Sequence, residues 1–491
     1  MNRLRAACNY ALGRQTGGAA AVAEASFRRR FPEYALTRAI DDLRRTEYGR
    51  LDRLGHTYLD YTGGSVYAEA QVREHLALLS RSVFGNPHSG NPASLAMTEL
   101  VELTRAAVLH YFRASADEYV VVFTQNATAA LRLVGEAYPF SSGGRYLLSA
   151  DNHNSVNGIR EFARQRGADV RYLPLTCPDL RLDTTALIDE LDRPVGGPKL
   201  FAYPAQSNFS GVQHPLGWVA EAKRRGWDVL LDAAAFAPTN QLDLTACQPD
   251  FVSLSFYKLF GYPTGVGCLI ARKDALSRLR RPWFAGGTIT FSSVRALDGG
   301  TDGYYLTPGA AGFEDGTINY LSVPAVSIGL RWLERIGVDL VHTRVRTLTR
   351  WLLEEIQTLR HTSGRPVVRL YGPRDGADRG ATIAMNFVDP TGTIWDCWEV
   401  ERRANRRNLS LRSGCHCNPG AREAALGFES AEMAACFAGK EQMPYTEFVR
   451  RIQPSVQGVV RVSLGLASTF HDVYRFLEFA REFTDRGCPN A

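Results

Sequence analysis

Lysine is scarce in this chain, and one lysine stands in a chemically unusual context. Only five of the 57 basic residues are lysine, and the other 52 are arginine. Lys258 follows an apolar run and precedes a glycine-rich turn in SLSFYKLFGYPTGVG. An amine at a strand end among apolar and aromatic groups can have a lowered pKa, which makes it a nucleophile toward carbonyl carbon. The other lysines, in charged, glycine-rich or polar stretches, are Lys199, Lys223, Lys273 and Lys440.

A carboxylate occupies a similar position earlier in the chain. Asp232 ends the apolar run DVLLD, and a buried carboxylate needs a cationic or hydrogen-bonded partner. A lysine that condenses with an aldehyde and an aspartate that keeps a ring nitrogen protonated are the pair required by pyridoxal phosphate. By itself, Asp232 is explained equally well as a helix cap or half of a structural ion pair.

Polar residues at the start of a helix suggest an anion site. In VVVFTQNATAALRLV, Thr124, Asn126 and Thr128 lie between an expected strand and an expected helix, where backbone N–H groups and the helix dipole favour anions. The glycine patterns of nucleotide-binding loops are missing from this segment. Plain N-capping is the simpler interpretation of the motif taken alone.

Two cysteines, Cys415 and Cys417, lie in LRSGCHCNPGA. Arg412 and His416 stand nearby, and cationic neighbours favour the reactive thiolate. The alternative is a pair of structural cysteines in a turn. A metal site is not expected, because no second cysteine–histidine cluster accompanies the pair. The nine cysteines include no C-x-x-C pair and suggest no disulfide framework, so we expect a reducing cytoplasm.

Short apolar runs alternate with helical segments from residue 119 onward. This alternation predicts an α/β fold with a largely parallel sheet, whose ligands bind at the carboxyl ends of the strands. The predicted strands are EYVVVFT, RYLLSA, DVRYLPL, KLFAYPA, DVLLDAA, DFVSLSF and GVGCLIA, with ATIAMNFVD and VVRVSLG in a smaller C-terminal domain.

The chain is expected to divide into three parts. Residues 1–54 read as a helical segment that packs with the small domain, residues 55–330 as the large domain, and residues 331–491 as the small domain that carries the cysteine loop. A long loop is expected at 285–318, and a polar, glycine-rich turn region at 360–380. Another loop, FGNPHSGNPAS, should precede the helix MTELVELTRAAVLHYF, with Thr98 as a possible cap.

Composition excludes several classes of protein. Apolar residues make up 45% and charged residues 22%, which is typical of a globular protein rather than a disordered chain. The net charge of +6 is small, and the arginines are scattered, so nucleic-acid binding is not expected. No apolar run is long enough to span a membrane, and the N-terminus has no continuous apolar region typical of a secretory signal.

Nine motifs, in order, resemble one enzyme group. The similarity, from about residue 55 to 480, is to the class V aminotransferase group of fold-type I pyridoxal phosphate enzymes, and within it to the cysteine desulfurase-like domain of molybdenum cofactor sulfurases. It implies a large domain with a mostly parallel sheet and a smaller α/β C-terminal domain. The combination of SFYK, FEDGT and G-C-x-C-N is specific. The motifs are YLDYTGG, FGNPHS, FTQNATAALRLV, YPAQSNFSG, LLDAAAF, SFYKLFGYPTGVG, FEDGTINYL, LRSGCHCNPGA and VRVSLG.

The resemblance assigns expected roles around the cofactor. Lys258 would bind pyridoxal phosphate and move the Cα proton of the substrate, and Asp232 would face the ring nitrogen. His153 would stack on the ring, although a lone histidine there would otherwise be taken as structural. Thr317 would reach the phosphate bound by a neighbouring subunit, which implies a homodimer. The positions matched on the phosphate side are Asn126, Ala127, Thr128, Ser255 and Tyr257.

The same resemblance predicts the reaction. Asn208 and Arg461 would hold the substrate carboxylate, assisted by Arg412, because a planar guanidinium meets two oxygens at once. Cys417 aligns with the thiol that takes sulfur from L-cysteine, leaving L-alanine and a persulfide for an acceptor, and Cys415 would be auxiliary. Glycines at 414 and 420 would let the loop move.

Two departures and several alternatives accompany this prediction. Ala235 stands where many cysteine desulfurases carry glutamine, and Tyr257 stands where they carry histidine; both choices resemble molybdenum cofactor sulfurases. The chain has no room for the further C-terminal domain of the eukaryotic sulfurases, so we expect the sulfur-mobilising half alone. The alternatives are another class V reaction on a related sulfur amino acid (C–S lyase, selenocysteine lyase, epimerase or transaminase) or a non-catalytic sulfur-carrier scaffold.

Overall fold

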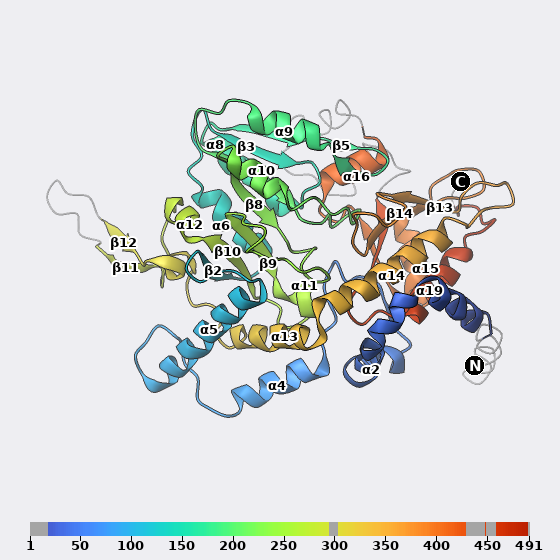
Figure 1. Cartoon of the computed structure of the whole chain (residues 1–491), viewed down its shortest axis with the longest axis horizontal. Coiled ribbons are helices and arrows are strands. Elements are labelled where there is room, and N and C mark those ends of the chain that lie inside the picture. The colour runs from blue at the N-terminus through green and yellow to red at the C-terminus, as the bar shows by residue number, and fades with distance from the viewer. Residues whose placement is uncertain (1–17, 294–302, 429–446, 448–457, 490–491) are drawn as a thin grey trace.

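A seven-stranded sheet forms the centre of the larger part of the molecule. The computed structural model describes residues 18–293, 303–428, 447 and 458–489 (Figure 1). All seven strands predicted for this sheet are confirmed. In spatial order they are β2 (Tyr119–Thr124), β10 (Gly267–Arg272), β9 (Phe251–Ser255), β8 (Asp228–Asp232), β7 (Lys199–Pro204), β3 (Arg145–Ser149) and β4 (Asp169–Leu173).

Strand direction brings six carboxyl ends to one edge of this sheet. Strands β3, β4, β7, β8 and β9 are mutually parallel, and β10 is antiparallel to both β9 and β2. Consequently β2 points the same way as the parallel strands, and only β10 runs against them. The sheet is therefore mostly parallel, as predicted.

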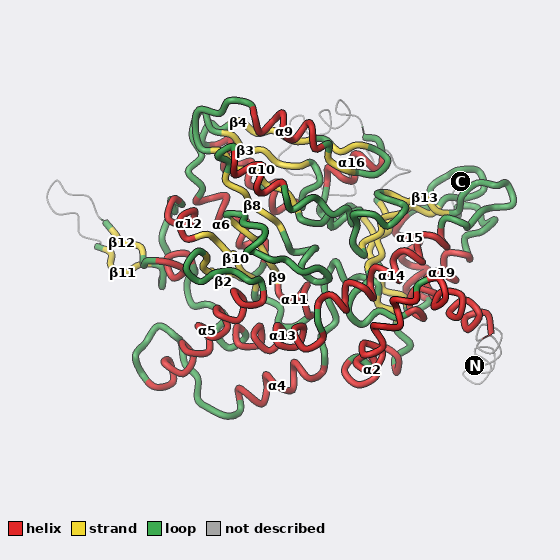
Figure 2. The backbone as a smooth tube through the Cα atoms, viewed as in Figure 1, coloured by secondary structure: helices red, strands yellow, loops and turns green. Residues whose placement is uncertain are grey.

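Helices cover both faces of the sheet (Figure 2). Alternate residues along a strand enter different cores: Tyr146 and Leu148 of β3 pack on one face, and Leu147 packs on the other. Because both faces are buried, the strands read as nearly continuous apolar runs. The helices of this part are α4 (Glu69–Leu79), α5 (Pro92–Tyr111), α6 (Ala127–Ala137), α7 (Asn154–Asn157), α8 (Ile159–Gln165), α9 (Thr184–Asp192), α10 (Trp218–Arg224), α11 (Phe256–Phe260), α12 (Lys273–Arg278) and α13 (Val323–Ile336).

One helix boundary differs from the sequence prediction. Helix α5 begins at Pro92, and Asn91 caps it by accepting a hydrogen bond of 3.0 Å from the Ser94 amide. Thr98 lies inside the helix, where its hydroxyl donates to the Ser94 carbonyl at 3.0 Å. The Asn-Pro pair was the true start signal, because proline suits the first helical position.

The smaller part contains a four-stranded antiparallel sheet, at the right of Figure 1. Its strands lie in the order β13 (Val368–Tyr371), β14 (Thr382–Phe387), β17 (Val459–Ser463) and β16 (Arg412–Gly414). Strand β13 falls inside 360–380, so the turn region expected there is interrupted by a four-residue strand. The remaining elements are α14 (Val338–Ile356), α15 (Cys397–Arg406), α16 (Pro419–Leu426), α19 (Phe470–Arg481) and β15 (Leu409–Ser410), which pairs in parallel with β1 (Thr57–Tyr58).

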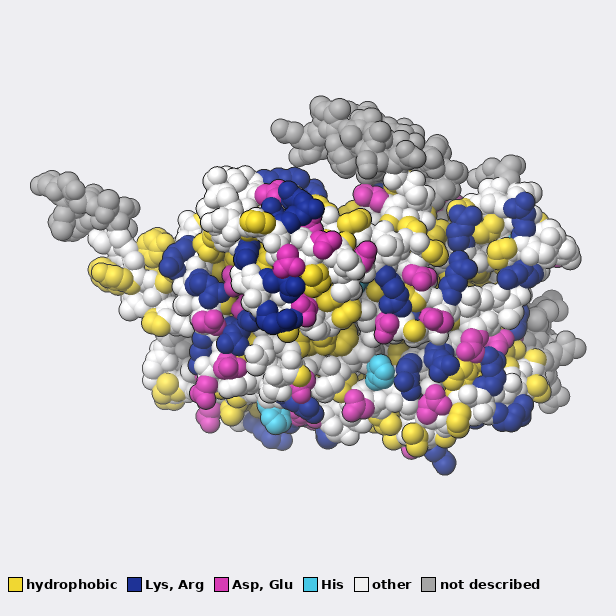
Figure 3. All heavy atoms as spheres, turned by 45° about the horizontal axis from the view of Figure 1, so that its top comes forward, with side chains coloured by type: hydrophobic (Ala, Val, Ile, Leu, Met, Phe, Trp, Pro, Cys, Tyr) yellow, Lys and Arg dark blue, Asp and Glu magenta, His cyan; other side chains and the backbone are white. Residues whose placement is uncertain are grey.

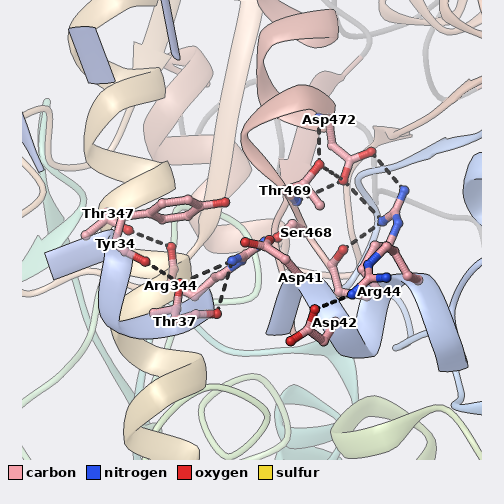
Figure 4. A network of polar contacts seen from close by, with 12 residues as sticks. Tyr34, Thr37, Asp41, Asp42, Arg44, Arg344, Thr347, Ser468, Thr469 and Asp472 are labelled. Carbon is pink, nitrogen blue, oxygen red and sulfur yellow. Dashed lines mark hydrogen bonds and ion pairs between the residues drawn. The ribbon is translucent and has the colours of Figure 1, made fainter. Parts of the chain in front are cut away.

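The N-terminal segment packs on α14 and α19. It comprises a helix over 18–30, η1 (Pro32–Thr37), α2 (Arg38–Glu47) and α3 (Arg50–Arg53). Two buried arginines connect this segment to the smaller part through a network of ion pairs and hydrogen bonds (Figure 4). Arg344 of α14 pairs with Asp41 and donates to the Ser468 carbonyl at 2.9 Å. Arg44 of α2 pairs with Asp472 of α19 at 3.2 Å.

Residues 285–318 are more structured than the predicted loop. A hairpin of β11 (Ile289–Ser292) and β12 (Tyr304–Leu306) projects from the large part, followed by η2 (Gly309–Phe313) (Figure 1). A second hairpin joins β5 (Leu175–Thr176) and β6 (Arg181–Leu182).

The surface carries charges of both signs. Basic and acidic side chains are interspersed on the face shown in Figure 3. Within the described residues, no helix combines the length and apolar character needed to cross a lipid bilayer.

Candidate active site

A cavity of about 140 Å³ lies where strands β7, β8 and β9 end. The structure brings nine of the predicted site residues together in its wall, although they come from separate segments of the sequence. Their common origin is the loops that follow the parallel strands and the first turn of α6, as expected for an open α/β sheet. They are Asn126, Ala127, Thr128, His153, Asn208, Asp232, Ser255, Tyr257 and Lys258.

Lys258 lies on the short helix α11, directly after β9. Its backbone carbonyl accepts a hydrogen bond of 2.6 Å from the Ser65 hydroxyl, which fixes the helix. Burial lowers the pKa of the Lys258 amine; Asp232 raises that pKa, whereas the nearby Arg461 lowers it. The Nζ atom has no hydrogen-bond partner among the described residues. The amine is thus biased toward its neutral, nucleophilic form.

Asp232 is the last residue of β8, and one of its carboxylate oxygens accepts hydrogen bonds from the protein. Its Oδ1 accepts hydrogen bonds from the Ala234 amide at 3.0 Å and from the Ser253 hydroxyl at 3.1 Å. Among the described residues, none donates to Oδ2, and the side chain lines the cavity. One oxygen therefore remains for a protonated ring nitrogen.

His153 caps the short helix α7 and also lines the cavity. Its Nδ1 accepts a hydrogen bond of 3.1 Å from the Ser155 amide, so the neutral ring carries its proton on Nε2. Burial lowers the pKa of His153, and the Lys258 charge lowers it further, whereas Asp232 raises it. These effects favour a neutral ring at pH 7.

Hydroxyl and amide groups meet at the start of α6. Asn126 caps this helix by accepting from the Ala129 amide at 3.0 Å, and the Ser255 hydroxyl accepts from the Ala127 amide at 2.8 Å. Thr128 Oγ1 lies 2.8 Å from the Ser155 hydroxyl. The capping interpretation is correct for Asn126, while the surrounding donors leave a polar end to the cavity.

Two arginines share one carboxylate beside the cavity. Arg461 is buried on β17, and its Nη2 lies 3.0 Å from Asp60 Oδ1. Its Nη1 donates to the Asn208 carbonyl at 2.9 Å. Arg412 on β16 pairs with Asp60 Oδ2 at 2.7 Å. The Arg461 Nε atom has no hydrogen-bond partner among the described residues.

Sequence reasoning missed Asp60 and Gln206. Asp60 lies in YLDYTGG, which contributed to the resemblance without any residue being singled out. The following Gly63 has no room for a side chain, because a Cβ atom there would lie 2.5 Å from the Asp60 carboxylate. Gln206 lines the cavity next to Ala235 and donates to the Ala235 carbonyl at 3.0 Å.

The cysteine loop lies against the same site. The Cys417 thiol is exposed and Cys415 is partly buried. Burial lowers the pKa of the Arg461 guanidinium, and the nearby Asp60 raises it. The Cys417 thiol has a smaller effect: it raises the pKa of Arg461 and also that of the Lys258 amine. Between the cysteines, burial lowers the pKa of His416 well below its usual value.

Contacts from outside the loop fix its backbone. The Cys417 carbonyl accepts from the Asn154 amide at 2.7 Å, and the His416 carbonyl accepts from Asn208 Nδ2 at 2.7 Å. Gly420 has a role different from the expected hinge, since a Cβ atom there would lie 2.3 Å from the Ala150 carbonyl oxygen. Glycine permits this close approach between the loop and the end of β3.

Thr317 lies outside the cavity in this single chain. It lines a separate space of about 390 Å³ with Thr124 and Trp283. Its hydroxyl accepts a hydrogen bond of 3.2 Å from Asn86 Nδ2. Within the described part of the chain, no group of histidine, cysteine, aspartate and glutamate side chains is suited to hold a metal ion.

The cavity fits pyridoxal phosphate. It presents an unpaired lysine amine for an aldehyde, a free oxygen of Asp232 for a ring nitrogen, and the His153 imidazole for a ring face. Hydroxyl groups and the start of an 11-residue helix provide a polar end for a phosphate. These groups are the ones that hold this cofactor in proteins.

Comparison with known proteins gives a family. A profile described as aminotransferase class-V matches residues 57–476. The molybdenum cofactor sulfurase of Bos taurus is 37% identical over 465 residues, covering 90% of this chain and 51% of the bovine protein. The chain spans about half the length of the curated relatives it matches.

Solved structures share the fold. The apo cysteine desulfurase of Thermococcus onnurineus superimposes with a TM-score of 0.74 at 24% identity, covering 90% of this chain and 97% of that one. A C-DES variant with a TM-score of 0.65 and 16% identity, covering 89% of this chain and 99% of that one, contains glycine covalently linked to pyridoxal phosphate. Because the family profile matches most of its length, the chain belongs to the aminotransferase class-V family, whose cofactor is pyridoxal phosphate.

Proposed function

We propose that this chain is a pyridoxal phosphate-dependent cysteine desulfurase. It removes sulfur from L-cysteine, leaving L-alanine and a persulfide on Cys417 that passes to an acceptor. The observation that carries this proposal is that the loop of the exposed Cys417 is bound to the wall of the cavity. The His416 carbonyl accepts a hydrogen bond of 2.7 Å from Asn208 Nδ2, and the Cys417 carbonyl accepts one of 2.7 Å from the amide of Asn154, the residue after His153. A thiol close to cationic groups is suited to nucleophilic attack.

The amino acid carboxylate is assigned to the arginine side of the cavity. Arg461 offers its unpaired Nε, and Arg412 adds a second positive charge, whereas Asp60 neutralises only one of the two. Asn208, held by Arg461 through its carbonyl, offers an amide beside them. This arrangement leaves one net positive charge for one carboxylate.

Lys258 is assigned to proton transfer at the reacting carbon, and His153 is assigned to the face of the cofactor ring. When bound, pyridoxal phosphate withdraws electrons from the amino acid and so acidifies its Cα proton. The Lys258 amine, biased toward neutrality by burial, takes this proton at Nζ and returns it. His153 stays neutral, so its ring covers the cofactor without adding a repelling charge next to Lys258.

Sulfur transfer is assigned to Cys417. Its thiolate attacks the sulfur of the bound cysteine, an S–S bond forms, and the C–S bond breaks. The electron pair of the broken bond goes to the substrate carbon, which gains a proton and becomes the methyl group of alanine. Cys415, two residues away and partly buried, is auxiliary.

Separate measurement of alanine, sulfide and protein-bound persulfide tests this function. The protein is incubated with L-cysteine as wild type, Cys417→Ser and Cys415→Ser, each with its bound cofactor. Cys417→Ser should lose alanine formation by roughly 100-fold or more, since a covalent step is removed, whereas Cys415→Ser should keep most of it. Near-normal sulfide without alanine from Cys417→Ser would instead identify a thiol-independent C–S lyase. Near-normal alanine would indicate that Cys415 accepts the sulfur, and the double variant should then lose it.

The assembly and the acceptor complete the proposal. The enzyme acts as a homodimer in the cytoplasm, with Thr317 of each subunit serving the phosphate site of the other. The similarity to molybdenum cofactor sulfurases points to a molybdenum cofactor, or a protein that carries one, as the sulfur acceptor. Adding persulfide-loaded protein to candidate acceptors and following transfer of labelled sulfur tests this point.

A further inference from the structure

A buried carboxylate joins three segments around the cysteine loop. Asp151 lies beyond the end of β3 and is fully buried. Its Oδ1 accepts hydrogen bonds from the Ser207 hydroxyl and from Asn418 Nδ2, both at 2.7 Å. Its Oδ2 lies 3.1 Å from His214 Nε2. The donors thus come from the segment that carries Asn208 and from the residue that follows Cys417.

Asn418 connects Asp151 to the cysteine loop through its hydrogen bonds. Its Oδ1 caps α16 by accepting from the Ala421 amide at 3.2 Å, and its Nδ2 also reaches Asn208 Oδ1 at 3.0 Å. Its backbone amide donates to the Cys415 carbonyl at 3.1 Å, which closes the turn that contains Cys417. A bond to a charged acceptor such as Asp151 is among the strongest of these contacts.

The loop needs an external anchor because its own conformation is unfavourable. The φ angles of His416 and Cys417 are 54° and 55°, in the left-handed region that side chains other than glycine rarely adopt. The His416 ring is buried, and neither of its nitrogens has a hydrogen-bond partner among the described residues. Contacts beyond the loop must hold it in this arrangement.

We propose that Asp151 is a positioning residue that holds the Cys417 loop against the wall of the cavity through Asn418. It has no part in the chemistry, because it is buried and does not line the cavity. The inference rests on the proposed function in one respect: the catalytic role of Cys417 comes from that proposal, whereas the contacts of Asp151 do not depend on it. The position of the thiol is thereby set by a fixed buried charge at the end of the central sheet.

Hydrogen exchange and steady-state kinetics on the cofactor-loaded enzyme test this role. The variants are Asp151→Ala, Asn418→Ala and their double, with Asp250→Asn as a matched control. Asp250 is also buried, but it pairs with Lys223 at 2.6 Å, away from the loop. Each single variant should speed exchange of the amides of 413–421 by roughly tenfold or more, because the loop loses its anchor.

The kinetic readout separates positioning from general stability. In both single variants kcat should fall roughly 10- to 100-fold with KM nearly unchanged, since a displacement of about 1 Å can cost this much. The double variant should lose less than the two single losses combined, because both changes remove one shared contact, although Asn418→Ala also removes the α16 cap and the contact with Asn208. Asp250→Asn should lower global stability while leaving loop exchange and kcat unchanged.

Several outcomes would overturn the proposal. Unchanged loop exchange in Asp151→Ala would do so, as would exchange that accelerates evenly along the whole chain. If Asp151→Ala does not fold, Asn418→Ala decides the question, because it removes the same contact from the loop side. Failure of the proposed function is distinguishable: Cys417→Ser would then retain alanine formation, while the exchange result on the loop would still stand.

Discussion

Asp60 and Arg461 form an ion pair of 3.0 Å in which the arginine is almost fully buried and the carboxylate nearly so. The pair joins the start of the large part to the last strand of the small sheet, and Arg412 shares its carboxylate. A buried guanidinium held in this way keeps its orientation, so Asp60 orients the group assigned to the substrate carboxylate.

Replacing Asp60 tests this dependence. Asp60→Asn should lower the free energy of unfolding by about 3 kcal/mol, because one charge of a buried pair loses its partner. It should also raise KM for L-cysteine roughly tenfold, since the affinity of an oriented guanidinium for a carboxylate is lost. Asp52→Asn is the control, because Asp52 pairs with buried Arg44 at 2.8 Å away from the cavity. A lower KM in Asp60→Asn would show that Asp60 competes with the substrate.

Borohydride reduction should attach the cofactor to Lys258. The reason is that burial lowers the pKa of its amine, which also has no hydrogen-bond partner among the described residues. In contrast, Lys223 is held by Asp250 at 2.6 Å, and Lys199 donates to the Arg225 carbonyl at 2.6 Å. Peptide mapping of the reduced protein checks this, with Lys258→Arg as the unlabelled control. A label on Lys223 or Lys273 would contradict the assignment.

Acid should destabilise the fold through His416. Burial, Arg461 and Arg412 hold the pKa of His416 well below 6.5, so below that pH the unfolded chain binds a proton that the folded chain does not. The free energy of unfolding therefore increases with pH in this window and decreases on acidification. For this one group the slope is up to ~1.4 kcal/mol per pH unit.

Denaturant unfolding between about pH 5 and pH 7.5 measures this slope. His416→Gln should flatten it, whereas His110→Gln, at a side chain with 84% exposure, should leave it unchanged. Burial also lowers the pKa of His153, so a residual slope of the same sign should remain. An identical slope in His416→Gln would refute the assignment to this residue.

Mixed dimers test the role proposed for Thr317. Thr317→Ala should weaken cofactor binding in a homodimer, and Lys258→Ala should abolish turnover. In a dimer that combines one subunit of each kind, one site receives Lys258 from one chain and Thr317 from the other. Co-expression with two different tags should therefore recover activity at that single site, and tagged single-variant dimers are the control. No recovery in purified mixed dimers would argue against action across the interface.

The sequence predicted the central sheet well and its direction only in part. Strands such as β8 and β9 are buried on both faces and therefore appear as uninterrupted apolar runs. The reversed direction of β10 leaves no mark in the sequence, because a strand has the same side-chain pattern either way. Strand β13 was missed because Val368–Tyr371 lies between glycine- and proline-rich segments, and its middle is exposed.

The site was predictable where a residue follows a strand and hidden where partners are distant. Local context alone singled out Lys258 and raised Asp232 as one of two equal interpretations. Asp60 was missed because its partner Arg461 lies 401 residues away, and Asp151 was missed because Asn418 lies 267 residues away. Neither carboxylate has a charged neighbour in sequence that would predict its ion pair or hydrogen bonds.

The anchoring of the N-terminal segment has a consequence for synthesis of the protein. Arg44 leaves the ribosome early, whereas its partner Asp472 is made 428 residues later. The smaller part of the molecule is therefore assembled from segments far apart in the sequence and cannot complete its core until α19 has been made. The large sheet, whose strands span 119–272, can form first. Until α14 and α19 have been made, the apolar surface of the N-terminal segment has no partner to cover it. This stage is the one most vulnerable to aggregation or proteolysis.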